Sequence, residues 1–246
     1  MNALFHALFH ALLEATFRAS ARLRSLPSKQ RTAHISAPNL DPQRAWASSA
    51  ASAPLDLQAL MGADAWSRLP AAVQRRFGLH AEPVHYVGRM DLRCSPLGRM
   101  LAWLAWPLRG PLTPDCARDL PVEVTVLPDG LGGVVWSRRL GRRLVQSVKR
   151  AHPAGPGVLE RTRGGLAMAL DVFEDDGALV FQSRHYLWCV GPMRLRLPDA
   201  LSPGQCRVEH RDLGAGRFRF TLTMTHARWG RTFEQTGVFI DPVQES

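Results

Sequence analysis

Residues 121–240 consist of segments in which apolar and polar side chains alternate strictly, separated by glycine-containing turns. The clearest is 217–224, where Phe218, Phe220, Leu222 and Met224 alternate with arginines and threonines. A repeat of two is that of a β-strand with one buried and one solvated face, which is typical of antiparallel sheets. Turn sequences between the apolar runs, such as Asp176-Gly177, favour hairpins. We therefore predict an antiparallel, mainly β domain.

The alternation predicts about nine strands, and no rhythm of strand, helix and strand separates them, which excludes a doubly wound nucleotide-binding fold. The expected strands lie near 121–127, 133–139, 143–150, 157–163, 165–173, 178–188, 206–212, 217–226 and 231–240. An open sheet of this size leaves two unpaired edges, which closure removes. The predicted fold class is α+β, mainly antiparallel β: a curved sheet or barrel preceded by short helices.

The chain divides into three predicted parts. Residues 1–24 have apolar side chains at helical spacing and a polar stripe, which predicts an amphipathic helix. We expect it to dock on its own domain or on a partner. Residues 25–54 are rich in proline and small residues and indicate a flexible linker. The mainly β domain is expected at 55–243.

Two helical stretches are predicted at the start of this domain. Apolar residues from Leu57 to Phe77 have helical spacing, with a break at Pro70. Residues 97–106 form a shorter apolar helix, in which we expect Trp103 and Trp106 in the core or in a pocket wall. It is too short for a transmembrane span, which needs about 20 residues.

The chain is strongly basic, with 31 Lys+Arg against 21 Asp+Glu and a net charge of +10. Arginine suits anionic partners, but a basic balance also arises from arginines on solvated faces, which is the interpretation we favour. The most basic stretch, 136–163, has Trp136 as its one aromatic residue. Single-strand binders interleave stacking aromatics with their basic residues, so nucleic acid is not the expected partner.

Cysteine and histidine spacing predicts no metal site. The four cysteines form no C-x-x-C pair, and they are typical of reduced thiols in a cytoplasmic protein; a disulfide between two of them remains open. Two loose groups have ligand-like side chains but lack a full ligand set. They are His6, His10 and Glu14, and His80, His85 and Asp91.

Two kinds of candidate site residue lie on the predicted strands. Glu160 and Glu209 could form a general acid and base if the fold brings them together, but ion pairs between neighbouring strands are the interpretation we favour for both. Trp136 with Arg138, and Arg184 with Tyr186, each combine a guanidinium with a ring on one side of a strand. Such a pair suits an anionic or planar ligand, but it also arises where an arginine lies across a ring at the rim of a barrel. His226 and Trp229 are further candidates for ligand contact.

A series of motifs is spaced along the second part of the chain. They are Trp66-(x)2-Leu69-Pro70, Leu101-Ala102-Trp103-Leu104, Pro121-Val122-(x)-Val124-(x)-Val126, Trp136-(x)-Arg138, Gly165-Leu166-(x)-Met168, Arg217-Phe218-(x)-Phe220 and Gly230-(x)2-Phe233-(x)-Gln235-(x)-Gly237-(x)-Phe239. This arrangement resembles the bacterial family named domain of unknown function 4166, over about residues 56–240. The resemblance implies a domain found alone or joined to NAD(P)-binding Rossmann proteins, with no catalytic residues to carry over. This chain has no G-x-G-x-x-G motif, so an oxidoreductase partner would act in trans.

The leading functional interpretation is a non-catalytic binding module for a small apolar or lipid-like molecule, because curved sheets of this size can enclose a ligand. The alternative is an enzyme, or an accessory domain working with an NAD(P)-dependent oxidoreductase. No cofactor is predicted for the chain itself. We expect a cytoplasmic protein, with peripheral membrane contact through residues 1–24 as a further hypothesis.

Overall fold

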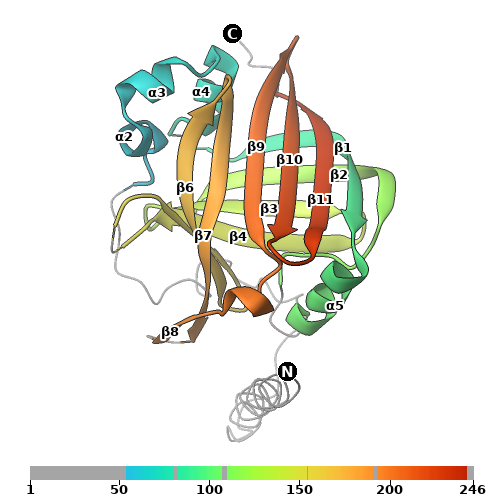
Figure 1. The fold of residues 1–246 in the computed structure, drawn as a ribbon. Coiled ribbons are helices and arrows are strands. Elements are labelled where there is room, and N and C mark those ends of the chain that lie inside the picture. Colours follow the sequence, from blue (N-terminus) through green and yellow to red (C-terminus); the bar gives the residue numbers. More distant parts are fainter. Residues whose placement is uncertain (1–53, 80–81, 107–109, 154, 191–192, 243–246) are drawn as a thin grey trace, which may run out of the picture. The chain divides into compact units, whose positions relative to one another are not determined.

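The chain folds into an antiparallel β-barrel preceded by short helices (Figure 1). The computed structural model describes residues 54–79, 82–106, 110–153, 155–190 and 193–242. Its strands are β1 (Val84–Cys94), β2 (Ala117–Pro128), β3 (Val134–Leu140), β4 (Arg143–Ala151), β5 (Val158–Thr162), β6 (Leu166–Asp175), β7 (Ala178–Val190), β8 (Met193–Arg196), β9 (Gln205–Gly214), β10 (Arg217–His226) and β11 (Gly230–Ile240).

Ten of these strands close the barrel. Neighbouring strands pair in the order β1 to β7 and then β9, β10 and β11, and β11 pairs with β1. The remaining strand, β8, extends the end of β7. The predicted fold class is therefore confirmed, and each of the nine predicted strands is present. β1 and β8 were not predicted from the sequence.

Short helices precede the barrel and connect its first two strands. They are α2 (Leu57–Met61), α3 (Ala63–Ser67), α4 (Ala71–Phe77) and α5 (Pro96–Ala105), and a 3-10 turn, η2 (Asp199–Leu201), lies between β8 and β9. Pro70 stands at the start of α4, as the predicted break requires. Ser95 caps α5 by accepting a hydrogen bond from the Gly98 amide at 3.1 Å.

Helices α2 to α4 cover one end of the barrel. Leu57, Trp66 and Val73 pack against Leu170 and other apolar side chains of the strands, and this buried group continues into the barrel core. The end of α4 reaches into the mouth of the barrel, where the Phe77 ring stacks on Trp136 at 5.8 Å. We call these three helices the cap, because they cover the opening at this end of the barrel.

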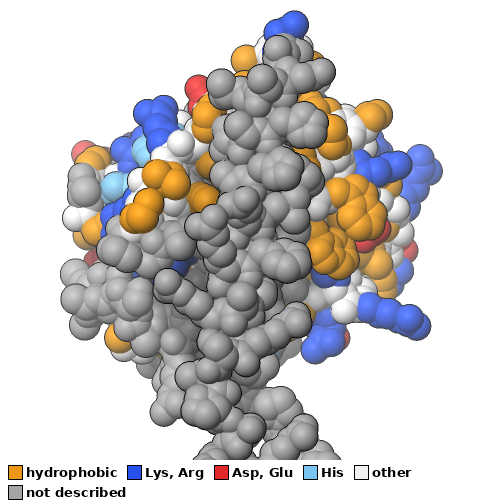
Figure 2. All heavy atoms as spheres, turned by 90° about the horizontal axis from the view of Figure 1, so that it is seen from below, with side chains coloured by type: hydrophobic (Ala, Val, Ile, Leu, Met, Phe, Trp, Pro, Cys, Tyr) orange, Lys and Arg blue, Asp and Glu red, His pale blue; other side chains and the backbone are white. Residues whose placement is uncertain are grey.

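Helix α5 exposes much of its apolar surface at the opposite end (Figures 1 and 2). Trp103 and Trp106 are 58% and 53% exposed and stack on each other at 5.6 Å. The expectation that both tryptophans lie in the core or a pocket wall is therefore wrong. The helix buries a narrow stripe that includes Gly98 and Ala102.

Several predictions fall outside the described residues. These are the helix at 1–24, the linker at 25–54 except for its last residue, and the ligand-like spacing of His6, His10 and Glu14. In the parts that the structure describes, no helix is long and apolar enough to cross a bilayer.

Candidate functional site

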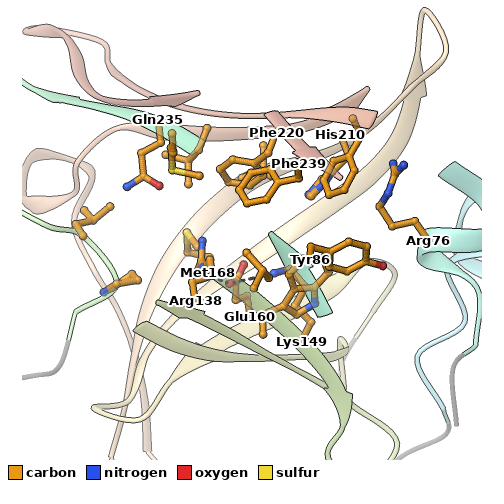
Figure 3. A pocket seen from close by; sticks show the side chains of 18 of the residues that line it. Arg76, Tyr86, Arg138, Lys149, Glu160, Met168, His210, Phe220, Gln235 and Phe239 are labelled. Atoms are coloured by element: carbon orange, nitrogen blue, oxygen red, sulfur yellow. Dashed lines mark ion pairs between the residues drawn. The ribbon is translucent and has the colours of Figure 1, made fainter. Parts of the chain in front are cut away.

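The barrel interior contains a small cavity of about 50 Å³, which we call the inner cavity (Figure 3). Most of its wall is apolar and comes from β1, β2 and β9 to β11. These apolar side chains include Tyr86, Val124, Val208, Phe218, Phe220, Leu222, Met224 and Phe239. The polar part of the wall is concentrated on β3 to β5, where Arg138, Lys149 and Glu160 face inward.

These three charged side chains form one buried cluster. The Lys149 Nζ atom lies 3.1 Å from Glu160 Oε1, and Arg138 Nη2 lies 3.9 Å from the same oxygen. Lys149 and Glu160 are directly opposite each other in the pairing of β4 with β5, and side chains at paired positions share a face of the sheet. The local strand pairing therefore places both side chains inside the barrel.

Glu160 is held as a carboxylate by its neighbours. Burial raises the pKa of Glu160, but Lys149, Arg138 and the Ser147 hydroxyl together bring this pKa below its ordinary value. The hydroxyl of Ser147 donates to Glu160 Oε1 at 2.6 Å. Burial is also the largest effect on Lys149, and it lowers the pKa of that amine despite the nearby carboxylate.

The cluster contains more positive than negative charge. Arg138 Nε is buried and has no hydrogen-bond partner among the described residues. The other guanidinium on the cavity wall, that of Arg76, donates two hydrogen bonds to Asp241, at 2.9 and 2.7 Å. One carboxylate, that of Glu160, thus faces two cations, Arg138 and Lys149, in the described wall.

Aromatic rings surround the ammonium of Lys149. Its nitrogen lies 4.9 Å from the ring centre of Trp136 and 5.7 Å from that of Phe181, distances at which a cation is attracted to a ring face. His210 contributes a further ring, 4.7 Å from Phe77. Burial and the surrounding cations lower the pKa of His210 well below its ordinary value, so this imidazole is neutral at pH 7.

A second, larger space of about 180 Å³ lies under the helical cap. We call it the mouth hollow. Its wall is formed by Leu55, Leu57 and Phe77 on one side and by Val126 and the β2–β3 turn on the other. Trp136, Lys149 and Arg76 line both the mouth hollow and the inner cavity, so the two spaces adjoin at these three side chains.

The structure brings some of the sequence-predicted site residues to this cluster. Trp136 and Arg138 both line the inner cavity. Tyr186 is paired with Met168, and Met168 with Glu160, so the tyrosine continues the inner row of side chains; its hydroxyl donates to the Gly204 carbonyl at 2.7 Å.

Other predicted residues lie away from the inner cavity. A register shift in the β6–β7 pairing puts Ser183 and Tyr186 opposite consecutive inner positions of β6. We expected Arg184 and Tyr186 on the same side of the strand, but the register shift separates them. Arg184 instead forms an ion pair with Asp171 at 3.3 Å. His226 and Trp229 stack at 4.2 Å near the β10–β11 turn and are not part of either wall.

The structure does not bring Glu160 and Glu209 together. Val208 and His210 on β9 line the inner cavity, so the side chain of Glu209 between them lies on the outer face. There it accepts a hydrogen bond from Arg211 at 2.9 Å. The two carboxylates are therefore not arranged as an acid and base for one substrate.

Lys149, His210 and Arg76 are site residues that sequence reasoning missed. Lys149 follows Val145 and Ser147 in a row of every second residue, and it is one of two lysines in the chain. This alternation could have indicated an inward-facing lysine. Arg76 gave no such signal, because its burial depends on how α4 enters the barrel.

No group of three or more potential metal ligands occurs among the described residues. The family model described as "Domain of unknown function (DUF4166)" matches residues 69–239. Comparison with curated proteins and with solved structures finds no match.

Proposed function

The chain belongs to the family described as domain of unknown function DUF4166, and from this premise we propose that its barrel is a binding module for a small, largely apolar molecule. The observation that carries the proposal is the pair of spaces inside the barrel and under its cap, walled mainly by apolar and aromatic side chains. Burial of apolar surface in such a space is the main source of affinity for a ligand of this kind.

The volumes limit the size of the ligand. Pockets for drug-sized molecules measure about 300–1,000 Å³, so neither space alone accepts a large lipid. The mouth hollow, at about 180 Å³, corresponds to about six water-sized groups. A molecule that occupies both spaces passes Trp136, Lys149 and Arg76, whose side chains line each of them.

An enzyme, or an accessory domain of an oxidoreductase acting in trans, is the alternative function. The sequence-based support for an enzyme was the carboxylate pair of Glu160 and Glu209, but these residues lie on opposite faces of the barrel wall. The buried cluster of Lys149, Glu160 and Arg138 instead provides fixed charges deep inside an apolar site, an arrangement that orients a bound molecule.

Titration calorimetry of the full chain with two eight-carbon probes, 1-octanol and octanoate, tests the binding function. We expect at least one probe to bind, and Val126→Phe to abolish this binding, because Val126 lines the mouth hollow. The matched control is Val87→Phe on β1, where the side chain is 54% exposed on the outer face. Failure of both probes to bind the wild-type chain, or equal binding by the two variants, would contradict the proposal.

A further inference from the structure

The buried charges of the inner cavity indicate what kind of head group the ligand carries. Resting on the binding function proposed above, we infer that the ligand is a monocarboxylic acid whose carboxylate binds between Arg138 and Lys149, with its apolar chain in the mouth hollow. The inference follows from three features of the cluster: its charge, its unused donor and its position between the two spaces.

The cluster has one more positive charge than negative charges, so one further anion would neutralise it. Arg138 and Lys149 both face Glu160 Oε1, at 3.9 and 3.1 Å, and the other cation of the wall, Arg76, is paired with Asp241. His210 is neutral, so it adds no positive charge. Removing an unpaired cation from water costs several kcal/mol, and a ligand with a single negative charge offsets that cost.

Arg138 has the hydrogen-bonding capacity that a carboxylate needs. Its Nε atom is buried and without a hydrogen-bond partner in the described part of the chain, and its contact with Glu160, at 3.9 Å, is longer than a hydrogen bond. A guanidinium presents its N–H groups as a planar fork that matches the two oxygens of a carboxylate. Glu160, by contrast, is already held by Lys149 and Ser147.

The position of Lys149 sets the direction of the bound molecule. Lys149 lines both spaces, whereas Arg138 lines the inner cavity and is not part of the wall of the mouth hollow. A carboxylate that contacts both residues therefore lies in the inner cavity, whose volume of about 50 Å³ suits a group of a few atoms. The chain that follows then extends past Trp136 into the mouth hollow, where Phe77, Phe181 and Val126 form an apolar wall.

The charge count also separates a carboxylate from a phosphate. Glu160 already neutralises one of the two cations, so a single negative charge brings the cluster to neutrality. A phosphate monoester carries a charge of about −1.5 to −2 at pH 7 and would leave an excess of buried negative charge beside Glu160. The site therefore favours a carboxylic acid over a phosphate ester with the same chain.

Titration calorimetry at pH 7 with octanoate, 1-octanol and octyl phosphate tests the inference on the full chain. We expect octanoate to bind about tenfold or more tightly than 1-octanol, because charge-assisted hydrogen bonds are the strong ones, and more tightly than octyl phosphate. Equal affinity for octanoate and 1-octanol would overturn the carboxylate inference and leave the binding function intact. Tighter binding of octyl phosphate would overturn the choice of a carboxylate. If neither octanoate nor 1-octanol binds, the binding function itself fails.

Matched variants show whether the two cations recognise the carboxylate. Arg138→Met and Lys149→Met should each weaken octanoate binding about tenfold or more and leave 1-octanol binding within a factor of about two. Arg139→Met is the control, since Arg139 is the next residue on β3, is 61% exposed and faces outward beside Glu123. Unchanged octanoate affinity in a folded Arg138→Met protein would overturn the inference, and the comparison of the probes on the wild-type chain decides it if a variant does not fold.

Discussion

The ammonium of Lys149 lies 3.1 Å from the carboxylate of Glu160, on the neighbouring strand and inside the barrel. Buried ion pairs add little net stability over an apolar pair of the same volume, but breaking one leaves an uncompensated buried charge. In this barrel, removal of the Glu160 carboxylate should cost more stability than removal of the Lys149 ammonium, because Glu160 also faces Arg138.

Glu160→Gln should therefore lower the free energy of unfolding by about 3–5 kcal/mol. The measurement is urea denaturation at pH 7, followed by circular dichroism. Glu123→Gln is the control, since the ion pair of Glu123 with Arg139 at 3.5 Å is exposed on both sides, and its loss should change stability by less than about 0.5 kcal/mol. Equal effects of the two substitutions would show that the buried cluster is not under the predicted electrostatic constraint.

The double variant Lys149→Met/Glu160→Gln isolates the interaction between the two residues. Once Lys149 is replaced, loss of the carboxylate removes one contact fewer, so the cost of the double variant should be smaller than the sum of the single costs. Directly contacting residues give coupling energies of about 0.5–3 kcal/mol. Additive effects in the same urea titrations would mean that the 3.1 Å contact contributes no coupling.

His210 should make the stability of the barrel depend on pH below about 6.5. The pKa of His210 is lowered well below its ordinary value of 6.5, first by burial and then by Arg76, Lys149 and Arg138. Between that lowered pKa and 6.5 the unfolded chain binds a proton that the folded chain does not. Folding stability is then fully present above pH 6.5 and falls as the pH decreases through this window, by at most about 1.4 kcal/mol per pH unit.

The contribution of His210 is separable from that of other histidines by substitution. Burial also lowers the pKa of His152 and of His185, so the wild-type profile contains several contributions. His210→Gln keeps a polar side chain and removes the titrating group. Urea denaturation between pH 5 and pH 8 should give a shallower dependence for this variant, and parallel profiles for the two proteins would exclude His210 as the cause.

Most of the barrel was predictable, because its inward positions alternate in sequence. β10 shows this best, with Phe218, Phe220 and Leu222 all buried. β1 was not predicted for two reasons. Its row of inward-facing apolar residues is interrupted at Gly88, where the Phe239 ring occupies the space of a side chain, and its outward-facing Val87 is apolar although exposed. Strand β8 has four exposed residues, so no buried face marks it.

Two of the three members of the charged cluster were predicted, but their assembly with Lys149 was not. Arg138 and Glu160 were recognised as candidates, and both are on the inner face. Lys149 lies opposite Glu160 because of the register of the β4–β5 hairpin. That register follows from the geometry of the turn between the two strands, and the sequence of a turn as long as this one does not specify its geometry. The same limit applies to Arg184, because one register shift in β7 separated it from Tyr186.

Gly98 on α5 should tolerate no side chain. A Cβ atom at Gly98 would meet the Thr232 carbonyl and the Phe233 ring of β11, so Gly98→Ala pushes the helix off the barrel. Overpacking of this kind costs about 1–3 kcal/mol, measured as a lower midpoint of thermal unfolding. Gly155→Ala is the control, because no atom lies within 4 Å of a Cβ at that position; similar losses in the two variants would contradict this account of α5 packing.

The thiols of Cys94 and Cys116 should form a disulfide on mild oxidation. Their sulfur atoms lie 3.4 Å apart, and Arg99 Nη2 lies 3.8 Å from the Cys116 sulfur. A backbone hydrogen bond with Cys94, the Cys94 thiol and Arg99 together lower the pKa of Cys116, whereas burial raises the pKa of Cys94. Cys116 is also exposed, so it is the thiolate that attacks first.

With glutathione disulfide as the oxidant, the exchange has two steps. The Cys116 thiolate attacks one sulfur of glutathione disulfide, forms a mixed disulfide and releases one glutathione thiolate. Cys94 then loses its proton to water and attacks the Cys116 sulfur, which releases the second glutathione and closes the protein disulfide. Because the two positions are 22 residues apart, the bond should raise the free energy of unfolding by about 3 kcal/mol.

Peptide mapping by mass spectrometry without reduction measures this outcome directly. We expect a cross-linked peptide that contains Cys94 and Cys116, while Cys189 and Cys206, which are buried, stay in the thiol form. Cys94→Ser should stop the reaction at the mixed disulfide on Cys116, and Cys116→Ser should prevent both steps. Persistent glutathionylation of Cys116 in the wild-type chain would contradict the prediction, because it would mean that Cys94 cannot reach the sulfur beside it.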